Sequence, residues 1–588
     1  MSGLCGIVSF AALRIEPGEL RALAESASYR APAGIGYRWL GEAGLACLAR
    51  DEGDREQPLL DSSGQVCAVL DGRLDNRAEL IAPLAPDGGA AASDVRLLLD
   101  AYLRWGEACT DHLLGDFAFA VWDAGRHRLL CAVDPLGIKP LHFARLGPLV
   151  CFASDAMQVL AHPAVPDGYD EGEIAAYLGS RCEDPERSFF AAVRRLAPGQ
   201  RLLADVDGLR VERYWSPRPA AIRYARDEDY AGHFRALFQQ AVTDRLRDAG
   251  SFAGIAMSGG LDSTSVAALA QRASGARAYT FAFDRLAECD ERTYSRTMTE
   301  ELGLVVEPVA VEQLWSLEPQ RALPYSPDTP FAGWHTCFEE IFRRMAAGGA
   351  RVLLTGHGGD DLLRGSSLIY AERLRRGDWR AVREVVRHAR GIGKTVPRAL
   401  YDYFGRPHLR SLRAWRPSRR EVYANLVEIP WYWRVANWHD RSCAASGIEV
   451  RHPFLDRRLF EYVLAIPGEQ LFRLPGYKNL LRRSMAGVLP ERVRLRHDKT
   501  KFTSFLDFVL LEKMAEEVRE LLRAPRSVDL GILEKDQLRN DFEGLITGRR
   551  DVSRRAFWYA LTLEIWLRRC EVIRKNRRCV AGSRLAAA

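Results

Sequence analysis

The segment best suited to chemistry is the string GIAMSGGLDSTSVAALAQRA, which covers residues 254–273. Its residue types predict a buried strand, a glycine turn and a helix that begins near Asp262 or Ser263. A helix start at the carboxyl end of a parallel strand offers free N–H donors and a positive dipole end, so it can bind an anion. Glycines let the backbone approach oxygen atoms, and serine hydroxyls add donors. The string therefore predicts an anion-binding loop made of Ser258, Gly259, Gly260, Asp262 and Ser263.

Asp262 has the wrong charge for such a loop, because its carboxylate would repel phosphate unless a cation lay between them. A second cluster, VLLTGHGGDDLLRG at 352–365, again runs from a strand into a glycine-rich turn and supplies Asp360 or Asp361. Two carboxylates and phosphate oxygens form the hard-oxygen site that Mg²⁺ prefers. We expect Asp262 and either Asp360 or Asp361 to hold Mg²⁺ and Gly356 to lie at the phosphates.

A third cluster, RLRHDKTKF at 494–502, is basic. Lys499 and Lys501 could neutralise charge that develops on phosphate and on a tetrahedral intermediate. A basic surface loop is the alternative interpretation of the same residues, and it stays open.

The elements that position these clusters fall into two groups. A chain of 588 residues exceeds a single core, which stops growing near ~250 to 300 residues. Short β-like runs such as CGIVSF, FAFAVWD and LVCFASD dominate the first 215 residues, with one helix expected over 94–105. After 215–229, apolar strands such as GIAM, AYTFAF and VLLTG each lead into a helix, which is the pattern of a parallel sheet. We predict an α/β protein, with an α+β sandwich at 1–215 and a parallel-sheet α/β domain at 225–588.

Composition argues against several other classes of protein. The formal charge of +6 is small for this length and gives no nucleic-acid footprint, and the basic stretch 568–578 is expected to be a solvated helix end. The 12 cysteines show no CxxC pair, which is against a zinc site or a disulfide framework. With no signal peptide and no apolar run of ~18 residues, we expect a reduced, cytoplasmic protein that binds no membrane.

The strings together resemble the asparagine synthetase superfamily over nearly the whole chain. SGGLDS lacks the spacing and lysine of a Walker loop and looks like the pyrophosphate loop of the N-type ATP pyrophosphatases. TGHGGDD, GIEVRHPFLDRRLFEYVLAIP and YKNLLRRSMAGVLPERVRLRHDKTKF follow in the family's order. The resemblance implies ATP and Mg²⁺ as cofactors, with Asp262 and Asp360 as the Mg²⁺ ligands and pyrophosphate on the loop at Ser258. It also implies a contact between Lys499 and the adenylate, and a place near adenine for Phe283.

Residues 1–215 resemble the glutaminase domain of these synthetases, an N-terminal nucleophile fold, but depart from it at its functional positions. Such a glutaminase needs a cysteine at the mature N-terminus, whereas four residues precede Cys5. Where the family has His-Arg-Gly-Pro-Asp, residues 29–33 read Tyr-Arg-Ala-Pro-Ala; where it has Asn-Gly-Glu, residues 71–73 read Asp-Gly-Arg. Arg73 would repel the ammonium group of glutamine. We therefore expect the glutaminase activity to be lost.

Without ammonia made on the same chain, an amine on another molecule becomes the expected nucleophile. The leading hypothesis is a lasso peptide cyclase, which adenylates an Asp or Glu side chain of a precursor peptide and closes a macrolactam with the N-terminal amine. His357 stands where asparagine and β-lactam synthetases carry a glutamate. It could accept a proton from the attacking ammonium or donate a hydrogen bond to phosphate, and both roles stay open.

This hypothesis implies a leader-peptide recognition protein and a leader peptidase as partners, beside the precursor peptide itself. The rivals are a glutamine- or ammonia-dependent asparagine synthetase, a β-lactam synthetase-like cyclase, and a non-catalytic homologue that binds a peptide. A non-catalytic scaffold has no need for a pair of magnesium-binding carboxylates, which argues against the last of these.

Overall fold

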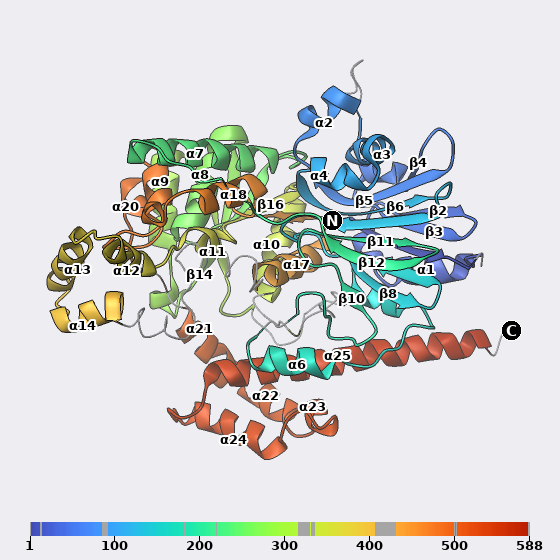
Figure 1. Ribbon diagram of the computed structural model, residues 1–588. Coiled ribbons are helices and arrows are strands. Elements are labelled where there is room, and N and C mark those ends of the chain that lie inside the picture. Colours follow the sequence, from blue (N-terminus) through green and yellow to red (C-terminus); the bar gives the residue numbers. More distant parts are fainter. Residues whose placement is uncertain are drawn as a thin grey trace.

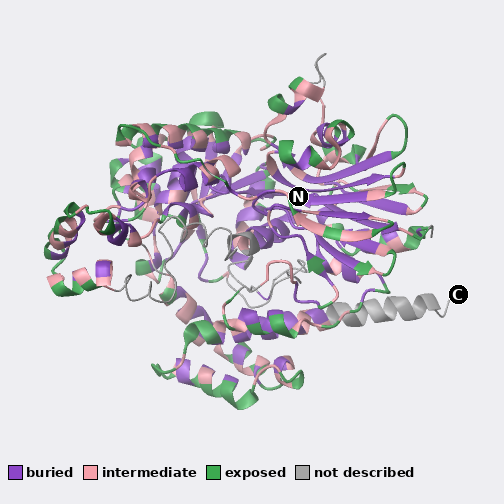
Figure 2. Ribbon diagram, in the orientation of Figure 1, coloured by how far each residue is buried: buried purple, intermediate pink, exposed green. Residues whose placement is uncertain are grey.

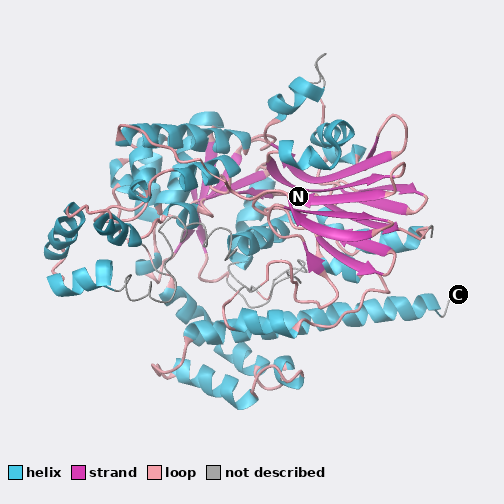
Figure 3. Cartoon of the chain, in the orientation of Figure 1, coloured by secondary structure: helices cyan, strands magenta, loops and turns pink. Residues whose placement is uncertain are grey.

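The computed structural model of the chain contains three sheets (Figure 1). It describes residues 2–11, 14–84, 92–181, 184–218, 220–314, 330, 335–405, 431–498, 500 and 502–585. Two antiparallel sheets of six strands come first along the sequence, and a parallel sheet of five strands follows (Figure 3).

The two antiparallel sheets share one apolar core and form a sandwich. One sheet has the order β10-β8-β9-β1-β3-β2 and the other β12-β11-β7-β6-β5-β4. The strands are β1 (Gly3–Ser9), β2 (Ile35–Leu40), β3 (Ala43–Leu48), β4 (Leu59–Leu60), β5 (Val66–Leu74), β6 (Gly115–Asp123), β7 (Arg128–Val133), β8 (His142–Leu146), β9 (Leu149–Ala153), β10 (Arg194–Arg195), β11 (Gln200–Asp205) and β12 (Gly208–Arg213).

Alternate side chains of strand β5 pack into two different hydrophobic cores. Cys67 and Val69 of β5 pack between the sheets, whereas Val66, Ala68 and Leu70 pack beneath the outer helices. This two-sided burial explains why the strands read as nearly continuous apolar runs. The helices of this part are α1 (Pro17–Glu25), α2 (Arg77–Leu84), α3 (Asp94–Trp105), α4 (Cys109–His112), α5 (Ala156–Leu160) and α6 (Glu171–Leu178), and α3 confirms the helix expected at 94–105.

The third sheet has the order β15-β14-β13-β16-β17, and all its neighbouring strands are parallel. Its strands are β13 (Ala253–Ala256), β14 (Ala276–Ala282), β15 (Val305–Ala310), β16 (Val352–Thr355) and β17 (Glu449–Arg451). The carboxyl ends of β13, β16 and β17 therefore lie at one edge, where ligands bind in sheets of this kind. A sandwich followed by a parallel sheet confirms the predicted fold class.

Helices surround this sheet and continue to the end of the chain. They are α7 (Asp227–Asp244), α8 (Leu261–Ser274), α9 (Arg292–Leu302), α10 (His335–Ala347), α11 (Gly359–Leu363), α12 (Leu368–Arg375), α13 (Arg380–Gly391), α14 (Val396–Leu400), α17 (Trp431–Ala444), α18 (Arg457–Ala465), α19 (Asn479–Ser484), α20 (Glu491–Arg494), α21 (Thr503–Asp507), α22 (Ala515–Leu521), α23 (Arg526–Asp529), α24 (Lys535–Ile546) and α25 (Arg554–Leu585). Among the described residues, none of the helices combines the length and apolar character needed to cross a bilayer.

The long helix α25 returns to the sandwich, where it runs alongside α6 (Figure 1). Trp566 is fully buried, and its ring lies 5.2 Å from that of Phe189 and 5.7 Å from that of Phe190. Thr562 Oγ1 lies 2.6 Å from the hydroxyl of Tyr177. Part of the buried stretch of α25 seen in Figure 2, which includes Trp566, thus belongs to the same core cluster as Cys5 in β1.

Candidate active site

The central strand of the parallel sheet leads directly into the loop that the sequence singles out. β13 ends at Ala256 and α8 begins at Leu261. The N–H of Ser258 donates to Ser263 Oγ at 3.0 Å, and the N–H of Gly260 donates to Ser258 Oγ at 3.2 Å. Gly260 precedes the helix without a side-chain cap. The loop is therefore shaped by its own serines and opens onto an uncapped helix start, which suits an anion.

Glycines let the neighbouring elements pack tightly against this loop. A Cβ at Gly356 would lie 2.6 Å from the backbone nitrogen of Ser263, which cannot move aside without shifting α8. A Cβ at Gly259 would lie 2.8 Å from Nη1 of Arg496, and the N–H of Gly259 donates to Glu291 Oε2 at 2.9 Å. The structure thus places Gly356 directly against the start of α8.

Asp262 and Asp360 converge on one ammonium group. Lys478 Nζ contacts Asp262 Oδ2 and lies 2.7 Å from Asp360 Oδ1. The two carboxylate oxygens are therefore no farther apart than two hydrogen bonds, roughly 6 Å. Burial lowers the pKa of Lys478, but the two carboxylates raise it more, so that its pKa lies above the ordinary value. The fold brings together two aspartates from distant segments around a position that holds a positive charge.

A magnesium ion fits this arrangement. Within the described parts of the chain, no cluster of three or more His, Cys, Asp or Glu side chains is placed to hold a metal. Two carboxylates are nevertheless a common protein contribution where phosphate oxygens and water complete the shell. The residues that would hold the ion are Asp262 and Asp360, and a Cβ at Gly359 would come within 2.6 Å of Asp262 Cγ.

Lys478 is a site residue that sequence reasoning missed. It precedes α19 with φ 59° and ψ 34°, in the left-handed region that non-glycine residues seldom occupy. Such a strained position at a site indicates a role for the residue. Its only signal in the sequence is its place in the string YKNLLRRSM. Lys499 and Lys501, which the sequence favoured instead, lie outside the described residues.

Three histidine rings meet behind the second turn. His357 follows β16, His452 follows β17 directly, and His439 lies on α17. The ring centroids are 5.3 Å apart for His357 and His452, 5.5 Å for His439 and His452, and 6.1 Å for His357 and His439. Thr355 Oγ1 accepts the N–H of His357 at 3.2 Å and lies 2.7 Å from His452 Nδ1.

The environment keeps two of these rings neutral. Burial, followed by the charge of His357, lowers the pKa of His439 to about 3, and the same two causes hold the pKa of His452 well below its usual range. His357 is the partly exposed member of the group. His439 and His452 lie 82 and 95 residues after His357 in the sequence. Because this spacing fits no known short motif, the sequence could not predict the histidine cluster.

Phe283 takes a different place from the other predicted site residues. Its side chain is buried, and its ring lies 5.0 Å from that of Phe505 and 5.8 Å from that of Phe502. Its backbone N–H donates to Asp290, and its carbonyl accepts from Arg292. The Phe283 ring is therefore part of the domain core rather than of the loop.

The sandwich holds Cys5 in a position unlike that of an exposed terminal nucleophile. Cys5 lies inside β1, paired with Ala46 of β3 on one side and Ala153 of β9 on the other. Its side chain is fully buried, and burial raises the pKa of its thiol. A thiol of this kind is a poor source of thiolate.

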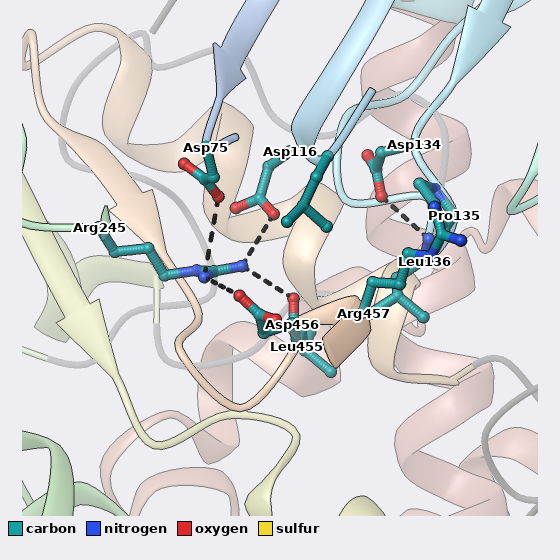
Figure 4. Close-up of a pocket in the computed structure, with 11 residues that line it drawn as sticks. Asp75, Asp116, Asp134, Pro135, Leu136, Arg245, Leu455, Asp456 and Arg457 are labelled. Atoms are coloured by element: carbon teal, nitrogen blue, oxygen red, sulfur yellow. Dashed lines mark hydrogen bonds and ion pairs between the residues drawn. The ribbon is translucent and has the colours of Figure 1, made fainter. Parts of the chain in front are cut away.

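Charged residues fill the contact between the sandwich and the parallel-sheet domain. Arg73 lies 2.9 Å from Asp75 and 2.8 Å from Asp116, and all three are buried. Arg245 of the second domain reaches Asp116 at 3.1 Å and Asp456 at 2.8 Å, beside a cavity of about 10 Å³ (Figure 4). That cavity has room for roughly one water molecule. Arg73 is thus paired with carboxylates of its own domain and, at 3.8 Å, with Glu449 of the second domain.

The same contact holds α17, which carries His439. Asp440 accepts from Arg30 Nη1 at 2.7 Å and from Lys139 Nζ at 2.9 Å, and both of these residues belong to the sandwich. Arg441 donates in the opposite direction, to Asp155 at 2.7 Å. The residue next to His439 is therefore anchored by buried ion pairs between the two domains.

Comparison with known proteins matches this arrangement. The sequence model of the asparagine synthase family matches residues 233–568, and that of a glutamine amidotransferase domain matches residues 1–215. The chain belongs to the asparagine synthase family. Its place there makes it an ATP-dependent carbon–nitrogen ligase that releases AMP, as the sequence predicted.

Relatives within the asparagine synthase family include two proteins of Bacillus subtilis (strain 168). The chain is 27% identical to asparagine synthetase (glutamine-hydrolysing) 3 over 482 residues, which cover 76% of this chain and 77% of the relative. It is 26% identical to asparagine synthetase (glutamine-hydrolysing) 2 over 524 residues, which cover 83% of this chain and 70% of the relative. These likenesses span both domains.

Proposed function

We propose that this chain uses ATP and Mg²⁺ to activate a carboxylate as its acyl-adenylate and then transfers the acyl group to an amine. The observation that carries the proposal is the meeting of Asp262 and Asp360 at one cationic position, beside the uncapped start of α8. A site with two carboxylates, an ammonium group and free helix-start donors suits a metal-bound pyrophosphate.

Each part of the site has a role in this chemistry. The Ser258–Ser263 loop binds the β and γ phosphates as they become the leaving group. Magnesium, when bound, neutralises phosphate oxygens and polarises the bond that breaks. Lys478, together with Lys499, neutralises negative charge on the leaving pyrophosphate and on the tetrahedral intermediate. Lys478 is suited to this because its pKa is raised, so that it is charged at neutral pH.

His357 accepts the proton that the attacking amine must lose. It is the partly exposed ring of the histidine cluster, and it lies three residues before Asp360 in the same turn. His439 and His452 stay neutral behind it, which avoids a build-up of positive charge when His357 is protonated. A general base of this type contributes typically 10²–10⁴-fold to the rate.

The substrate in this proposal is a precursor peptide, and the product is a lasso-type macrolactam. An Asp or Glu side chain of the peptide is adenylated, and the amine of its first residue then attacks the acyl carbon. The departures of the sandwich domain support this choice, because a buried Cys5 and an ion-paired Arg73 leave no thiolate and no glutamine-holding carboxylate. A leader-recognition protein and a leader peptidase would supply the mature substrate.

Asparagine synthesis is the second candidate, and the names of the Bacillus relatives favour it. It requires ammonia, either from solution or from glutamine. The two candidates share the adenylation step and differ only in the amine, so one set of incubations separates them.

The test combines two readouts. ATP–pyrophosphate exchange in the presence of candidate acids reports adenylation, and mass spectrometry reports loss of one water from a peptide or amidation of free aspartate. We expect Asp262→Asn and Asp360→Asn to lower exchange at least about 100-fold, the usual scale for residues that stabilise a transition state. Asp361→Asn is the matched control, because the ion pair of Lys478 in this turn is with Asp360.

Full exchange by both Asp262→Asn and Asp360→Asn would contradict adenylation at this site. Amidation of aspartate with no peptide dehydration would keep the adenylation site and replace the macrolactam by asparagine synthesis.

A further inference from the structure

The segment 364–405, which contains α12, α13 and α14, carries an unusual share of the charge. It holds ten Lys and Arg residues against four Asp and Glu residues. This excess of six equals the formal charge of the whole chain, so the other residues balance one another. The three helices lie at the end of the molecule away from the sandwich (Figure 1).

All four carboxylates of this segment already have partners. Glu384 and Asp378 both pair with Arg373 at 2.8 Å. The other two pairs are Glu372 with Arg376 at 3.7 Å and Asp402 with Lys394 at 2.6 Å. Arg398 also lies 3.4 Å from Asp402, so the four acidic residues of the segment are paired with four of its basic side chains.

Four further arginines form a stripe along α13: Arg380, Arg383, Arg387 and Arg390. Their spacing of three, four and three residues places them on one face of the helix, over roughly 15 Å. All four are exposed, and within the described residues none of them pairs with a carboxylate. Like charges at this spacing repel one another, so the stripe works against the helix that carries it.

The opposite face of α13 is already occupied. Ala381, Val385 and Ala389 are fully buried in a small core that also contains Tyr370 of α12 and Phe472. The apolar face is thus not available to enter a lipid bilayer, as a membrane-surface helix would require. What the helix presents outward is the arginine stripe, which we call the α13 arginine face.

Exposed apolar side chains lie at the two ends of α13. Trp379 directly precedes the helix and is 71% exposed, and Ile392 directly follows it and is 57% exposed. A large aromatic and an aliphatic side chain beside four cations form a surface that suits an amphipathic polypeptide better than a polymer of phosphates alone.

The helices α12, α13 and α14 are connected to the active site both along the chain and by side-chain contacts. α11, which carries Asp360, ends five residues before α12 begins. The Tyr370 hydroxyl accepts the N–H of Leu474 at 3.2 Å, and the ring of Phe472 lies 5.0 Å from that of Tyr477, next to Lys478. A partner on the α13 arginine face would therefore be separated from Lys478 by the small core that contains Tyr370 and Phe472.

We propose that the α13 arginine face is a docking surface for an acidic peptide segment with apolar anchors. Carboxylates of the segment would pair with the arginine stripe, and its apolar side chains would cover Trp379 and Ile392. The docking is independent of the amide-forming step, because none of these residues belongs to the adenylation site.

Nucleic acid is the weaker match for this surface. A stripe of roughly 15 Å spans only a few phosphates, and the remainder of the chain offers no excess positive charge to extend it. Trp379 offers a single ring on which a base could stack, and Ile392 offers none. An acidic peptide of roughly 12 residues, by contrast, matches the length of α13 when helical.

The test measures binding of a fluorescent peptide of that length to the full-length protein by anisotropy, with Glu residues at i, i+3, i+4 and i+7 positions and Leu residues between them. The main variant is Arg383→Gln, Arg387→Gln and Arg390→Gln combined, since Gln retains helix propensity. We expect about tenfold weaker binding, the scale for three exposed ion pairs, and a smaller loss of affinity with added salt than in the unmodified protein. ATP–pyrophosphate exchange should stay unchanged.

A charge-matched control changes three other arginines, partly or fully exposed, to Gln. Arg519, Arg523 and Arg526 lie on or beside α22 and α23, so the net charge falls equally but away from α13. Equal weakening by the control would overturn the proposal, because binding would then reflect total charge. Tighter binding of a single-stranded RNA of equal charge, or of vesicles rich in anionic lipid, would also overturn it.

Discussion

Acidification should weaken this fold through His439, and replacing that histidine should remove a defined part of the effect. In the unfolded chain the imidazole has an ordinary pKa of ~6.5. In the folded protein, burial and the charge of His357 lower the pKa of His439 to about 3. Since the folded pKa is the lower one, the unfolded chain takes up the proton first as pH falls. The stability contributed by neutral His439 is therefore present above pH ~6.5 and is lost progressively between pH ~6.5 and ~3.

The size of the effect at pH 5 follows from these two values. Protonation of the unfolded imidazole at that pH is worth about 2 kcal/mol, whereas the folded form gains almost nothing. The assay is urea unfolding at pH 8 and pH 5, followed by tryptophan fluorescence. The free energy of unfolding of His439→Leu should fall by about 2 kcal/mol less between these pH values than that of the unmodified protein.

Phe338→Leu is the control for altered packing, because the Phe338 ring lies 5.4 Å from that of His439 and carries no titrating group. Its pH dependence should follow that of the unmodified protein. Other groups with depressed pKa values, such as Asp456 and Glu449, affect all three chains alike and cancel. Equal losses of stability in His439→Leu and in the unmodified protein would refute the reasoning, since the buried ring would then titrate normally.

Three further substitutions test other parts of the structure. Gly356→Ala places a Cβ 2.6 Å from the Ser263 nitrogen, so we expect the free energy of unfolding to fall by about 1–3 kcal/mol and adenylation to slow. Unchanged kinetics of ATP–pyrophosphate exchange would argue against this packing. Trp566→Ala removes a fully buried ring from the sandwich core and should lower the free energy of unfolding by about 3–5 kcal/mol, measured by urea titration; a change below about 1 kcal/mol would contradict that burial. Cys5→Ala should leave amide-forming turnover unchanged in a coupled AMP-release assay, and loss of glutamine-dependent product in the variant would show that the thiol works after all.

Local patterns were enough to predict the elements that carry the anion-binding loop. The runs GIAM and VLLTG became β13 and β16, and the glycine turns after them became the starts of α8 and α11. Strand and helix periods are local properties, so a short window of sequence contains them. The neighbourhood of Asp262 and Asp360 could also be inferred, because both follow parallel strands and such strands end at one edge.

Contacts between distant segments were beyond the sequence. Lys478 meets Asp262 across 216 positions, and its left-handed backbone cannot be read from a lysine. His439 and His452 reach His357 only because α17 and β17 pack beside β16. The pair between Arg30 and Asp440 joins residues 410 positions apart. The identity of the amine and of the acid depends on surfaces of this kind, which explains why the family could be predicted from motifs and the substrate could not.

The burial of α25 in the core of the sandwich has a consequence for how the protein is made. β1 is synthesised before α25, so the cluster around Cys5 is incomplete until Trp566 has been added to the chain. The apolar groove of the sandwich therefore stays uncovered while more than five hundred further residues are synthesised. A chain that stops before α25 would present this groove to chaperones and proteases, so only molecules that contain α25 would close it. The core of the sandwich is therefore complete only once α25 has packed into it.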